Sequence, residues 1–479
     1  MFNFFKRKPK TIAMAYSPHK FTRKEERAYW GDANSLSANA TFLPEDRRKW
    51  RNIARYETNC NSYGKGLILT LANIGIGRGP RLQLLTEDEN YNSKVEQEFA
   101  AWAETINLGE KLKTMRKAKC VDGEAFAIIN INPKVKHGVK IDLKLIECDR
   151  VTTLEPNLEQ QRIDGIHFDK YGNPESYDVL KEHPGDISFT AYNKTESIAA
   201  EFMLHWFRQD RPEQSRGITE LLPSLPLFAQ LRRYTLAVIE SAETAASISA
   251  LFTSNGADTR SVDLVKEGDD YSTENPKSME LRKNMGIFLP AGWDMKQIDP
   301  KQPTTNYQMF KREILSEMAR CLEIPVNIVL GDSSNFNYAS GRLDHQIFHR
   351  NIRNEQNQCE KVVMFPLFEV FYREGVRVGL FPDYGIPYMS SQYARFYWDG
   401  LEHVDPYKEA QAMTARVDAG LTNDSIECAN LGHDWEDVLE QRMRELKRKQ
   451  DLAKKYGVEL PEKKENKKET QNAEKESDE

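Results

Sequence analysis

The chain has 479 residues, of which 39% are hydrophobic and 29% are charged, and its formal net charge at pH 7 is −6. This length and apolar content can build about two to four structural units with real cores, which excludes a chain that is disordered as a whole. No run of roughly 18 apolar residues occurs, so no transmembrane helix is predicted, and the first ten residues lack the apolar region of a signal peptide. The negative charge has the wrong sign for a protein that grips nucleic acid through counterion release.

The sequence also lacks the motifs of several enzyme classes. It has no Gly-x4-Gly-Lys-Ser/Thr phosphate loop, no Gly-x-Ser-x-Gly elbow and no His-x-Glu deaminase site. Its six cysteines are scattered without paired short spacing, which predicts reduced thiols rather than a zinc site or a disulfide framework. His345 and His349 have the spacing of a zinc-protease helix, but Gln346 stands where that chemistry needs a glutamate base. We therefore predict no catalytic residues, no metal and no cofactor.

In chain order, the first 43 residues are mostly polar and predict a flexible N-terminal arm. Residues 44–71 show a helical pattern that ends in a Gly-rich turn, and residues 93–114 are helical again. The turn follows a helix rather than a strand, so it does not fit a dinucleotide-binding motif. Strand signals occur at 120–131 and 140–146 and between 163 and 180. These elements predict an α+β domain over residues 44–217.

Two acidic residues and two arginines in this domain are candidates for chemistry. Asp122 and Glu124 alternate onto the polar face of a strand start, so we assign them no catalytic role. A short apolar strand over 202–207 leads into an Arg-rich loop that contains Arg211 and Arg216. These arginines are candidates for phosphate contacts or for intersubunit salt bridges, of which we favour the salt bridges.

The stretch from Leu227 to Phe252 contains no Gly or Pro, and its apolar residues recur at helical steps. It predicts one helix about 39 Å long. The second half is so rich in Ala and Ser that neighbouring helices could approach closely, whereas a buried core helix is the alternative interpretation. The candidate subunit-interface residues on this helix are Leu231, Val238, Ala242, Ala245, Ala246 and Ser249.

A second helix is predicted over residues 306–323, ending before Pro325. Between the two helices, residues 255–303 are mostly polar and hold strand candidates at 285–289 and 295–298. After the second helix, residues 331–341 form a polar loop without apolar periodicity, and the helical pattern resumes at about Arg342.

The C-terminal part is predicted to be mainly helical. Residues 342–374 form a helix with a kink near Pro366, and an aromatic stretch punctuated by prolines follows at 382–398. Helices are predicted over 406–420 and 424–456. Beyond Pro461, Lys and Glu dominate, which is typical of a solvated, disordered tail.

The run from Ile287 to Arg342 resembles the signature of lambda-type bacteriophage portal proteins. It reads IFLPAGWDMKQIDPKQPTTNYQMFKREILSEMARCLEIPVNIVLGDSSNFNYASGR, with the family's Pro/Gly turn, Asp-Pro step, Asn-Tyr step, apolar helix and polar loop in order. Ala291 in the turn and Ala339 in the loop are small departures that leave the resemblance intact. The motif DGEAF at 122–126 and the loop at 211–217 also match, and the resemblance extends from about residue 44 to about residue 451.

The resemblance implies an α+β, portal-type ring subunit with an α+β wing, a long-helix stem, a small clip and a helical C-terminal crown. Such proteins form a ring, usually of twelve subunits, at one vertex of the capsid. A terminase motor packages double-stranded DNA through the ring, and the DNA later leaves by the same route. The major capsid protein and head-completion or tail connector proteins would be further partners, and no membrane is implied. The ring would assemble in the host bacterial cytoplasm and remain in the virion.

The family layout also predicts how the chain is divided. The predicted parts are the N-terminal arm (1–43), the wing (44–217), a stem helix (218–253), the clip (254–303), the second stem helix (304–324), the tunnel loop (325–341), the wing completion (342–400), the crown (401–456) and the charged tail (457–479).

The resemblance places the polar loop after the second stem helix in the DNA channel. Its Ser and Asn side chains can make transient hydrogen bonds with phosphate, whereas Asp332 adds repulsion. Because the ring multiplies the negative net charge, its walls would favour sliding over tight binding. The alternative is a surface loop without a role in DNA passage. The candidate channel residues are Asp332, Ser333, Ser334, Asn335, Asn337 and Ser340.

Two other functional classes stay open at this point. A capsid-associated protease or nuclease would show metal-dependent or serine-dependent activity. A monomeric nucleic-acid-binding module would need a basic face, which the composition does not suggest.

Overall fold

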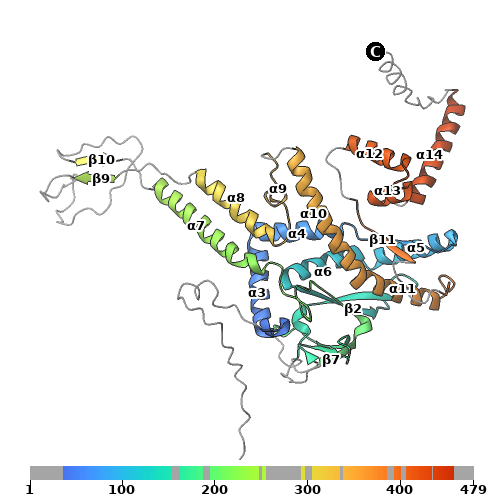
Figure 1. Ribbon diagram of the computed structural model, residues 1–479, viewed down its shortest axis with the longest axis horizontal. Coiled ribbons are helices and arrows are strands. Elements are labelled where there is room, and N and C mark those ends of the chain that lie inside the picture. Colours follow the sequence, from blue (N-terminus) through green and yellow to red (C-terminus); the bar gives the residue numbers. More distant parts are fainter. Residues whose placement is uncertain are drawn as a thin grey trace, which may run out of the picture. The chain divides into compact units, whose positions relative to one another are not determined.

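The computed structural model describes residues 36–153, 162–186, 195–247, 251–254, 293–296, 305–334, 338–385, 393–400, 406–433 and 435–457 (Figure 1). The chain divides into two compact units. Unit 1 comprises residues 1–48, 69–218 and 349–479, and unit 2 comprises residues 49–68 and 219–348. Most of the predicted arm and clip, the strand candidate at 285–289 and the charged tail lie outside the described residues.

Unit 1 contains most of the strands and the C-terminal helices. Helices α3 (Pro44–Cys60), α4 (Ser62–Ile76) and α10 (Tyr338–Cys359) contribute residues to both units. The other elements of unit 1 are α2 (Ala38–Thr41), β1 (Arg81–Leu84), α5 (Glu89–Thr105), α6 (Leu108–Asp122), β2 (Glu124–Ile131), β3 (Ile141–Ile146), β4 (Arg162–Ile163), β5 (Ile166–Phe168), β6 (Pro174–Leu180), β7 (Thr195–Ala199), β8 (Met203–Phe207), α11 (Phe365–Arg377), β11 (Ala394–Tyr397), α12 (Pro406–Asp418), α13 (Asp424–Asn430) and α14 (Trp435–Tyr456).

The strand pairs described in unit 1 are all antiparallel. The predicted hairpin is confirmed as β2 paired with β3, and β8 pairs with the other edge of β2, so Phe126 lies between Ile146 and His205. β4, β5, β6 and β7 form a four-stranded meander, and β1 pairs with the distant β11. The sequence therefore predicted the local hairpin, whereas the partners of β1 and of the outer edge of β2 come from far along the chain.

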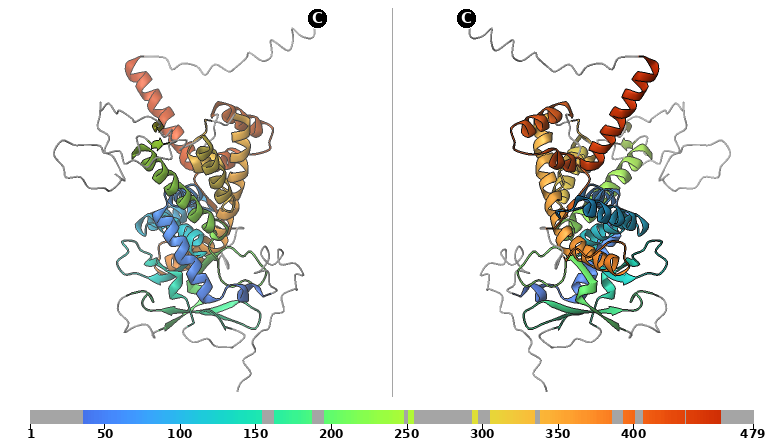
Figure 2. Two further views of the ribbon diagram at one scale, coloured as in Figure 1. Left: turned by 90° about the vertical axis from the view of Figure 1, so that its left-hand side faces the viewer. Right: turned by 90° about the vertical axis from the view of Figure 1, so that its right-hand side faces the viewer.

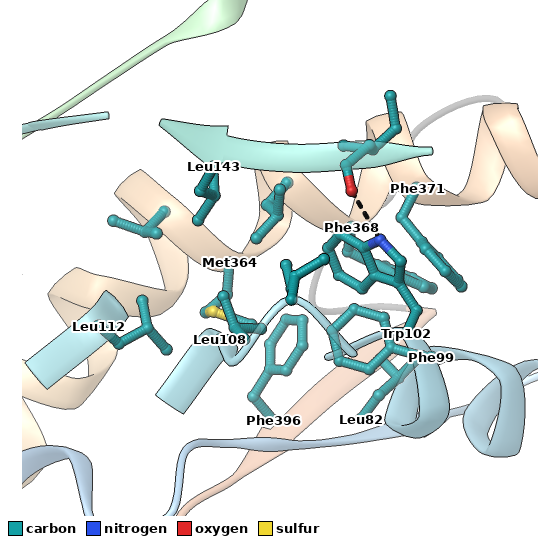
Figure 3. Packing of buried hydrophobic residues seen from close by; sticks show 14 of the residues in the cluster. Leu82, Phe99, Trp102, Leu108, Leu112, Leu143, Met364, Phe368, Phe371 and Phe396 are labelled. Atoms are coloured by element: carbon teal, nitrogen blue, oxygen red, sulfur yellow. Dashed lines mark hydrogen bonds between the residues drawn. The ribbon is translucent and has the colours of Figure 1, made fainter. Parts of the chain in front are cut away.

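The main core of unit 1 packs α5, α6 and α11 with β2, β3 and β11 (Figure 3). Phe99 meets Phe371 edge to face at a ring-centroid distance of 5.2 Å, and Trp102 lies 4.8 Å from the same ring. The indole N–H of Trp102 is buried and donates to the Ile141 carbonyl at 2.9 Å, the bond dashed in Figure 3. This donor is satisfied, so the ring adds apolar contact area without an unpaired polar atom.

The predicted kink near Pro366 is confirmed, and its form is a π-helical segment. α10 passes into a π-helix at Glu360–Met364, and α11 follows at Phe365, with a change of direction visible in both views of Figure 2. Pro366 has no N–H to donate to the carbonyl four residues earlier, which accounts for the break in the α-helical bonding at this point.

Unit 2 is built on α7 (Leu225–Ser247) and α8 (Thr305–Arg320), which pack against each other, and on the short α9 (Val326–Leu330). The predicted helix through Phe252 is wrong at its C-terminal end. Leu251–Ser254 forms strand β9 instead and pairs antiparallel with β10 (Trp293–Lys296), so that Phe252 lies opposite Met295. A β-branched and aromatic stretch that finds a strand partner overrides the local helical pattern.

Other predicted helices are divided more finely than the sequence indicated. The stretches 44–71 and 93–114 each contain two helices, and 424–456 contains α13 and α14, separated at Gly432, whose φ is 76°. Among the described residues, no helix is both long enough and apolar enough to cross a membrane.

Two glycine backbones meet where the chain leaves unit 1. Gly123 ends α6 at a φ of 91°, a left-handed conformation that glycine adopts without strain. A Cβ built on Gly217 would lie 2.1 Å from the Gly123 carbonyl oxygen. The start of β2 and the segment before Ile218 therefore approach more closely than any side chain allows.

Replacing Gly217 with alanine should destabilise the protein by about 1–3 kcal/mol, because the new methyl group overlaps the Gly123 carbonyl. Gly66 is the matched control, since it is exposed within α4 and an added Cβ meets nothing within 4 Å. Gly66→Ala should raise stability by up to about 1 kcal/mol. Urea unfolding followed by circular dichroism measures both changes, and equal stability of the two variants would contradict the close approach.

Candidate functional site

The α7–α8 pair of unit 2 holds several of the predicted interface residues. Leu231 and Val238 on α7 are buried, as are Leu315 and Met318 on α8. At the base of the pair, the Ser224 hydroxyl donates to the Met318 carbonyl at 2.8 Å. The prediction that Leu231 and Val238 contact another subunit is therefore wrong, because the helix turns both side chains into the core of its own unit.

Two large apolar side chains of α7 are exposed among charged residues. Leu236 is 52% exposed and Ile239 is 47% exposed, and their three-residue spacing puts them on one face. Ala242, one helical step further, is partly exposed. Ala245 and Ala246 lie within the bounds of α7, and their side chains, like Ser249, lie outside the described residues.

Two further exposed apolar pairs lie in unit 2. Met309 and Phe310 on α8 are 67% and 46% exposed, and the Phe310 ring lies 4.8 Å from Tyr234 of α7 in an edge-to-face contact. Leu343 and Ile347, one turn apart near the start of α10, are 61% and 55% exposed. Such large apolar side chains in contact with water are typical of a surface that another protein covers.

The candidate channel loop is shorter than the sequence indicated. α9 ends at Gly331, whose φ is 62°, and Asp332, Ser333 and Ser334 follow it on the surface. α10 begins at Tyr338 rather than at about Arg342, so Ser340 lies in the helix and not in the loop. Asn335 and Asn337 lie outside the described residues.

Asp332 is held as a carboxylate at the surface. Its Oδ1 accepts the Ser334 backbone N–H at 2.9 Å, which closes a small turn. Hydrogen bonds from Ser334 lower the pKa of Asp332 below its ordinary value, and Arg312 lowers it further. The loop therefore presents a fixed negative charge beside Ser hydroxyl groups.

The loop at 208–217 is folded by Gln214. Its buried side-chain oxygen accepts the backbone N–H groups of Asp210 (2.9 Å) and Arg211 (3.2 Å), while its amide donates to the Arg216 carbonyl at 2.9 Å. This geometry leaves Arg211 exposed, where it donates to the Thr41 hydroxyl at 2.9 Å and to the Leu36 carbonyl at 3.1 Å. The same geometry turns Arg216 inward.

Arg216 is buried in unit 1 and pairs with carboxylates of its own chain. Its Nε donates to Glu124 Oε2 at 2.9 Å, and its Nη2 donates to Glu124 Oε1 at 2.6 Å. Its Nη1 reaches the Val151 carbonyl at 3.0 Å and the Asp164 carboxylate at 3.0 Å. The prediction of an intersubunit salt bridge at Arg216 is therefore wrong, because only about 1% of this side chain is exposed.

The partners of Arg216 are placed by local turns. Asp164 and Gly165 both have positive φ (40° and 83°) and form the two-residue turn between β4 and β5. The Asp164 side chain also pairs with Arg47 of α3. Glu124, expected on a polar strand face, is fully buried, since Arg216 and His205 supply the partners that a buried carboxylate needs.

Two opposing effects set the pKa values of Glu124 and His205: burial disfavours their charged forms, and their charged or hydrogen-bonding partners favour them. Burial disfavours the charged form of Glu124, but the Arg216 charge and hydrogen bonds from His205 and Arg216 hold its pKa well below the usual range. Burial lowers the pKa of His205 and outweighs the attraction of Glu124, so His205 is neutral near pH 7. The buried pair is therefore Arg216⁺ with Glu124⁻.

The first of the two spaced histidines contacts the neighbouring helix α9. His345 Nε2 lies 3.1 Å from the side-chain nitrogen of Asn327 in α9, so this imidazole fastens α9 to the start of α10. Within the described ranges, the one His, Cys, Asp and Glu grouping compact enough for a cation lies elsewhere, at Glu147, Asp149 and His183.

Comparisons with known proteins agree with the motifs. Residues 23–356 match the family described as phage portal protein, lambda family. A probable portal protein of Halomonas phage phiHAP-1 is 24% identical over 482 residues, a match that covers 92% of this chain and 88% of that protein.

The fold is similar to chains in the neck of gene transfer agent (GTA) particles. A chain of the neck of an empty particle, computed with C6 symmetry, is 15% identical, with a TM-score of 0.50 over 82% of this chain and 94% of that chain. A chain of the neck of a native particle, computed with C12 symmetry, is 14% identical, with a TM-score of 0.44 over 82% of this chain and 94% of that chain.

Replacing Glu124 with glutamine should lower the free energy of unfolding by about 3–5 kcal/mol near pH 7, because Arg216 is left buried without its counter-charge. The pKa of Glu124 is depressed in the folded state, so its contribution is complete above the unfolded-state pKa of about 4.3 and is lost as pH falls further. The stability difference between wild type and variant should therefore persist down to about pH 5 and narrow below it.

Glu110 provides the matched control, because it forms a surface pair with Lys113 within α6. Glu110→Gln should leave unfolding unchanged. Urea titrations of the three proteins across this pH range measure the differences. If the Glu124→Gln variant is as stable as wild type at neutral pH, the Arg216–Glu124 pair does not stabilise the fold.

Proposed function

Because the chain belongs to the lambda family of phage portal proteins, we propose that it assembles into a closed ring of twelve subunits at one capsid vertex. Double-stranded DNA passes through the axis of this ring, driven inward by a terminase motor during packaging, and leaves by the same route. The single observation that carries this proposal is the family match over residues 23–356, which includes α7, α8 and the 331–337 loop. The C6 symmetry of the similar neck particle supports a cyclic arrangement.

The protein acts as a structural conduit in this proposal. The motor is a separate ATPase, consistent with a sequence that has no phosphate-binding loop. The α+β part of unit 1 corresponds to the wing, α7 and α8 to the stem, residues 254–303 to the clip, and α12 to α14 to the crown. The clip meets terminase and later the head-completion and tail proteins, the wing faces the major capsid protein, and the ring resides in the virion after assembly in the bacterial cytoplasm.

Subunit contact in the ring uses the exposed face of α7. Leu236 and Ile239 are large, apolar and about half exposed, which is unfavourable in water and favourable against a neighbouring helix. Ala242, Ala245 and Ala246 continue along the same helix with small side chains that permit close approach. Arg211 remains a candidate for a salt bridge to the next subunit, since its guanidinium is at the surface.

Replacing both Leu236 and Ile239 with arginine should reduce the ring population at least about tenfold, because two charges would be buried at the contact. Helical content should be unchanged, since both side chains are exposed. The matched control is Tyr171→Arg, which is 77% exposed in the β5–β6 turn and should assemble normally. Mass photometry gives the distribution of species, and wild-type rings from the double variant would exclude this face from the interface.

Passage of DNA requires a surface that fills the channel without gripping phosphate. Ser333 and Ser334 supply hydroxyl groups, and the Asp332 carboxylate beside them repels the backbone of DNA. Lysine at these positions would instead release counterions and make each contact strongly salt-dependent.

Lysine at Ser333, Ser334 and Asn335 should leave the ring intact but slow DNA packaging, most strongly at low ionic strength. The added charge is matched in a control with lysine at Asn90, Gln97 and Ala100, three exposed residues of α5. Packaging by the cognate terminase across a salt series is the measurement. If the loop variant packages as fast as this control at every salt concentration, the loop is a surface loop without a role in DNA passage.

A further inference from the structure

A histidine and two carboxylates meet in unit 1, apart from the residues that the proposed function names. Glu147 and Asp149 belong to the segment around a 3-10 helix at Cys148–Arg150, directly after β3. His183 lies in the turn after β6. One ligand atom from each side chain lies within 4.8 Å of the other two.

The spacing of these atoms matches a coordination shell. His183 Nε2 lies 3.0 Å from Glu147 Oε2 and 3.7 Å from Asp149 Oδ2. Ligand atoms around a tetrahedral ion with bonds of about 2.1 Å are separated by about 3.4 Å, between the two observed distances. His183 Nε2 is enclosed by protein and makes no hydrogen bond despite these short distances, so the ring nitrogen is not aimed along a line to either oxygen.

The turn that carries His183 is held in place by other residues. Arg150 donates from Nε and Nη2 to the Leu180 carbonyl at 2.9 and 2.7 Å, and from Nη2 to the Lys181 carbonyl at 2.8 Å. The Arg150 guanidinium therefore bonds to backbone carbonyls at the end of β6. The carboxylate of Asp149 is 4% exposed and that of Glu147 is 61% exposed, so the cluster is open on one side to ions from solvent.

We propose that Glu147, Asp149 and His183 bind one divalent transition-metal ion, with water in the remaining coordination positions. One imidazole nitrogen with two carboxylate oxygens suits Zn²⁺ or Mn²⁺, whereas Mg²⁺ and Ca²⁺ prefer shells made only of oxygen. The ion joins the segment after β3 to the turn after β6, and its role is to fasten these two chain segments within unit 1.

Binding through Nε2 requires a change of tautomer. The Gly185 N–H donates to His183 Nδ1 at 3.0 Å, so the hydrogen of the neutral ring is on Nε2 when no ion is bound. On binding, this hydrogen moves to Nδ1 and the Gly185 bond is lost, with no net release of a proton. Gly185 is exposed, so water replaces the lost partner at small cost.

The test is calorimetric titration of the full-length chain with ZnCl₂, MnCl₂ and MgCl₂. It uses a Cys60→Ser background because Cys60 is an exposed cysteine, a residue type that can itself act as a zinc ligand. One Zn²⁺ or Mn²⁺ should bind per chain, and His183→Ala and Glu147→Gln should each weaken its affinity at least about tenfold. The same ion should raise the melting temperature of the parent and leave that of His183→Ala unchanged. Mg²⁺ should bind much more weakly.

The matched control is His167→Ala, because His167 faces the single carboxylate of Asp178 at 2.9 Å and lies in the same unit. This variant should bind the ion as the parent does. Absence of saturable binding of Zn²⁺ and Mn²⁺ by the parent, or binding that survives both His183→Ala and Glu147→Gln, would overturn the proposal. Equal affinity for Mg²⁺ would overturn the assignment to transition metals.

Discussion

The buried pair of Arg216 and Glu124 is the constraint on which unit 1 depends. A guanidinium that is almost fully enclosed is costly unless its N–H groups find acceptors. Here the acceptors come from the start of β2, the Val151 carbonyl and the Asp164 turn. One side chain thus fixes the three-stranded sheet, the four-stranded meander and the exit of the chain at Gly217, where only glycine permits the backbones to meet.

The buried charges that stabilise unit 1 are distinct from the exposed apolar side chains of unit 2. Arg216 pairs with carboxylates inside unit 1, whereas unit 2 exposes large apolar side chains on α7, α8 and α10. In the ring that we propose, contacts between apolar side chains are not weakened by charge screening as ion pairs are. In the same proposal, the Asp332 carboxylate is the charge that repels DNA at the loop.

The π-helical segment shows how polar residues can fix a bend inside a core. Glu355 accepts from the buried Lys119 of α6 at 2.5 Å, and Gln358 accepts from the Trp206 indole of β8 at 3.1 Å. Trp398, just after β11, donates to Glu360 at 2.6 Å. Each of these bonds ties the α10–α11 junction to a different element of unit 1, so the junction is set by its neighbours as well as by Pro366.

The sequence by itself determined the family, the α+β class, the β2–β3 hairpin, the α7–α8 pair and the absence of nucleotide-binding motifs, because periodicity, turn residues and motif order are local properties. It could not decide which face of α7 would be buried, so it did not separate the buried Leu231 and Val238 from the exposed Leu236 and Ile239. It also misplaced Arg216 and Glu124, whose charges look solvent-exposed until their distant partners are known. Glu147 and Asp149 gave no signal of His183, which lies more than thirty residues away. These outcomes were decided by tertiary structure alone, because burial and pairing depend on which remote segments fold against a residue.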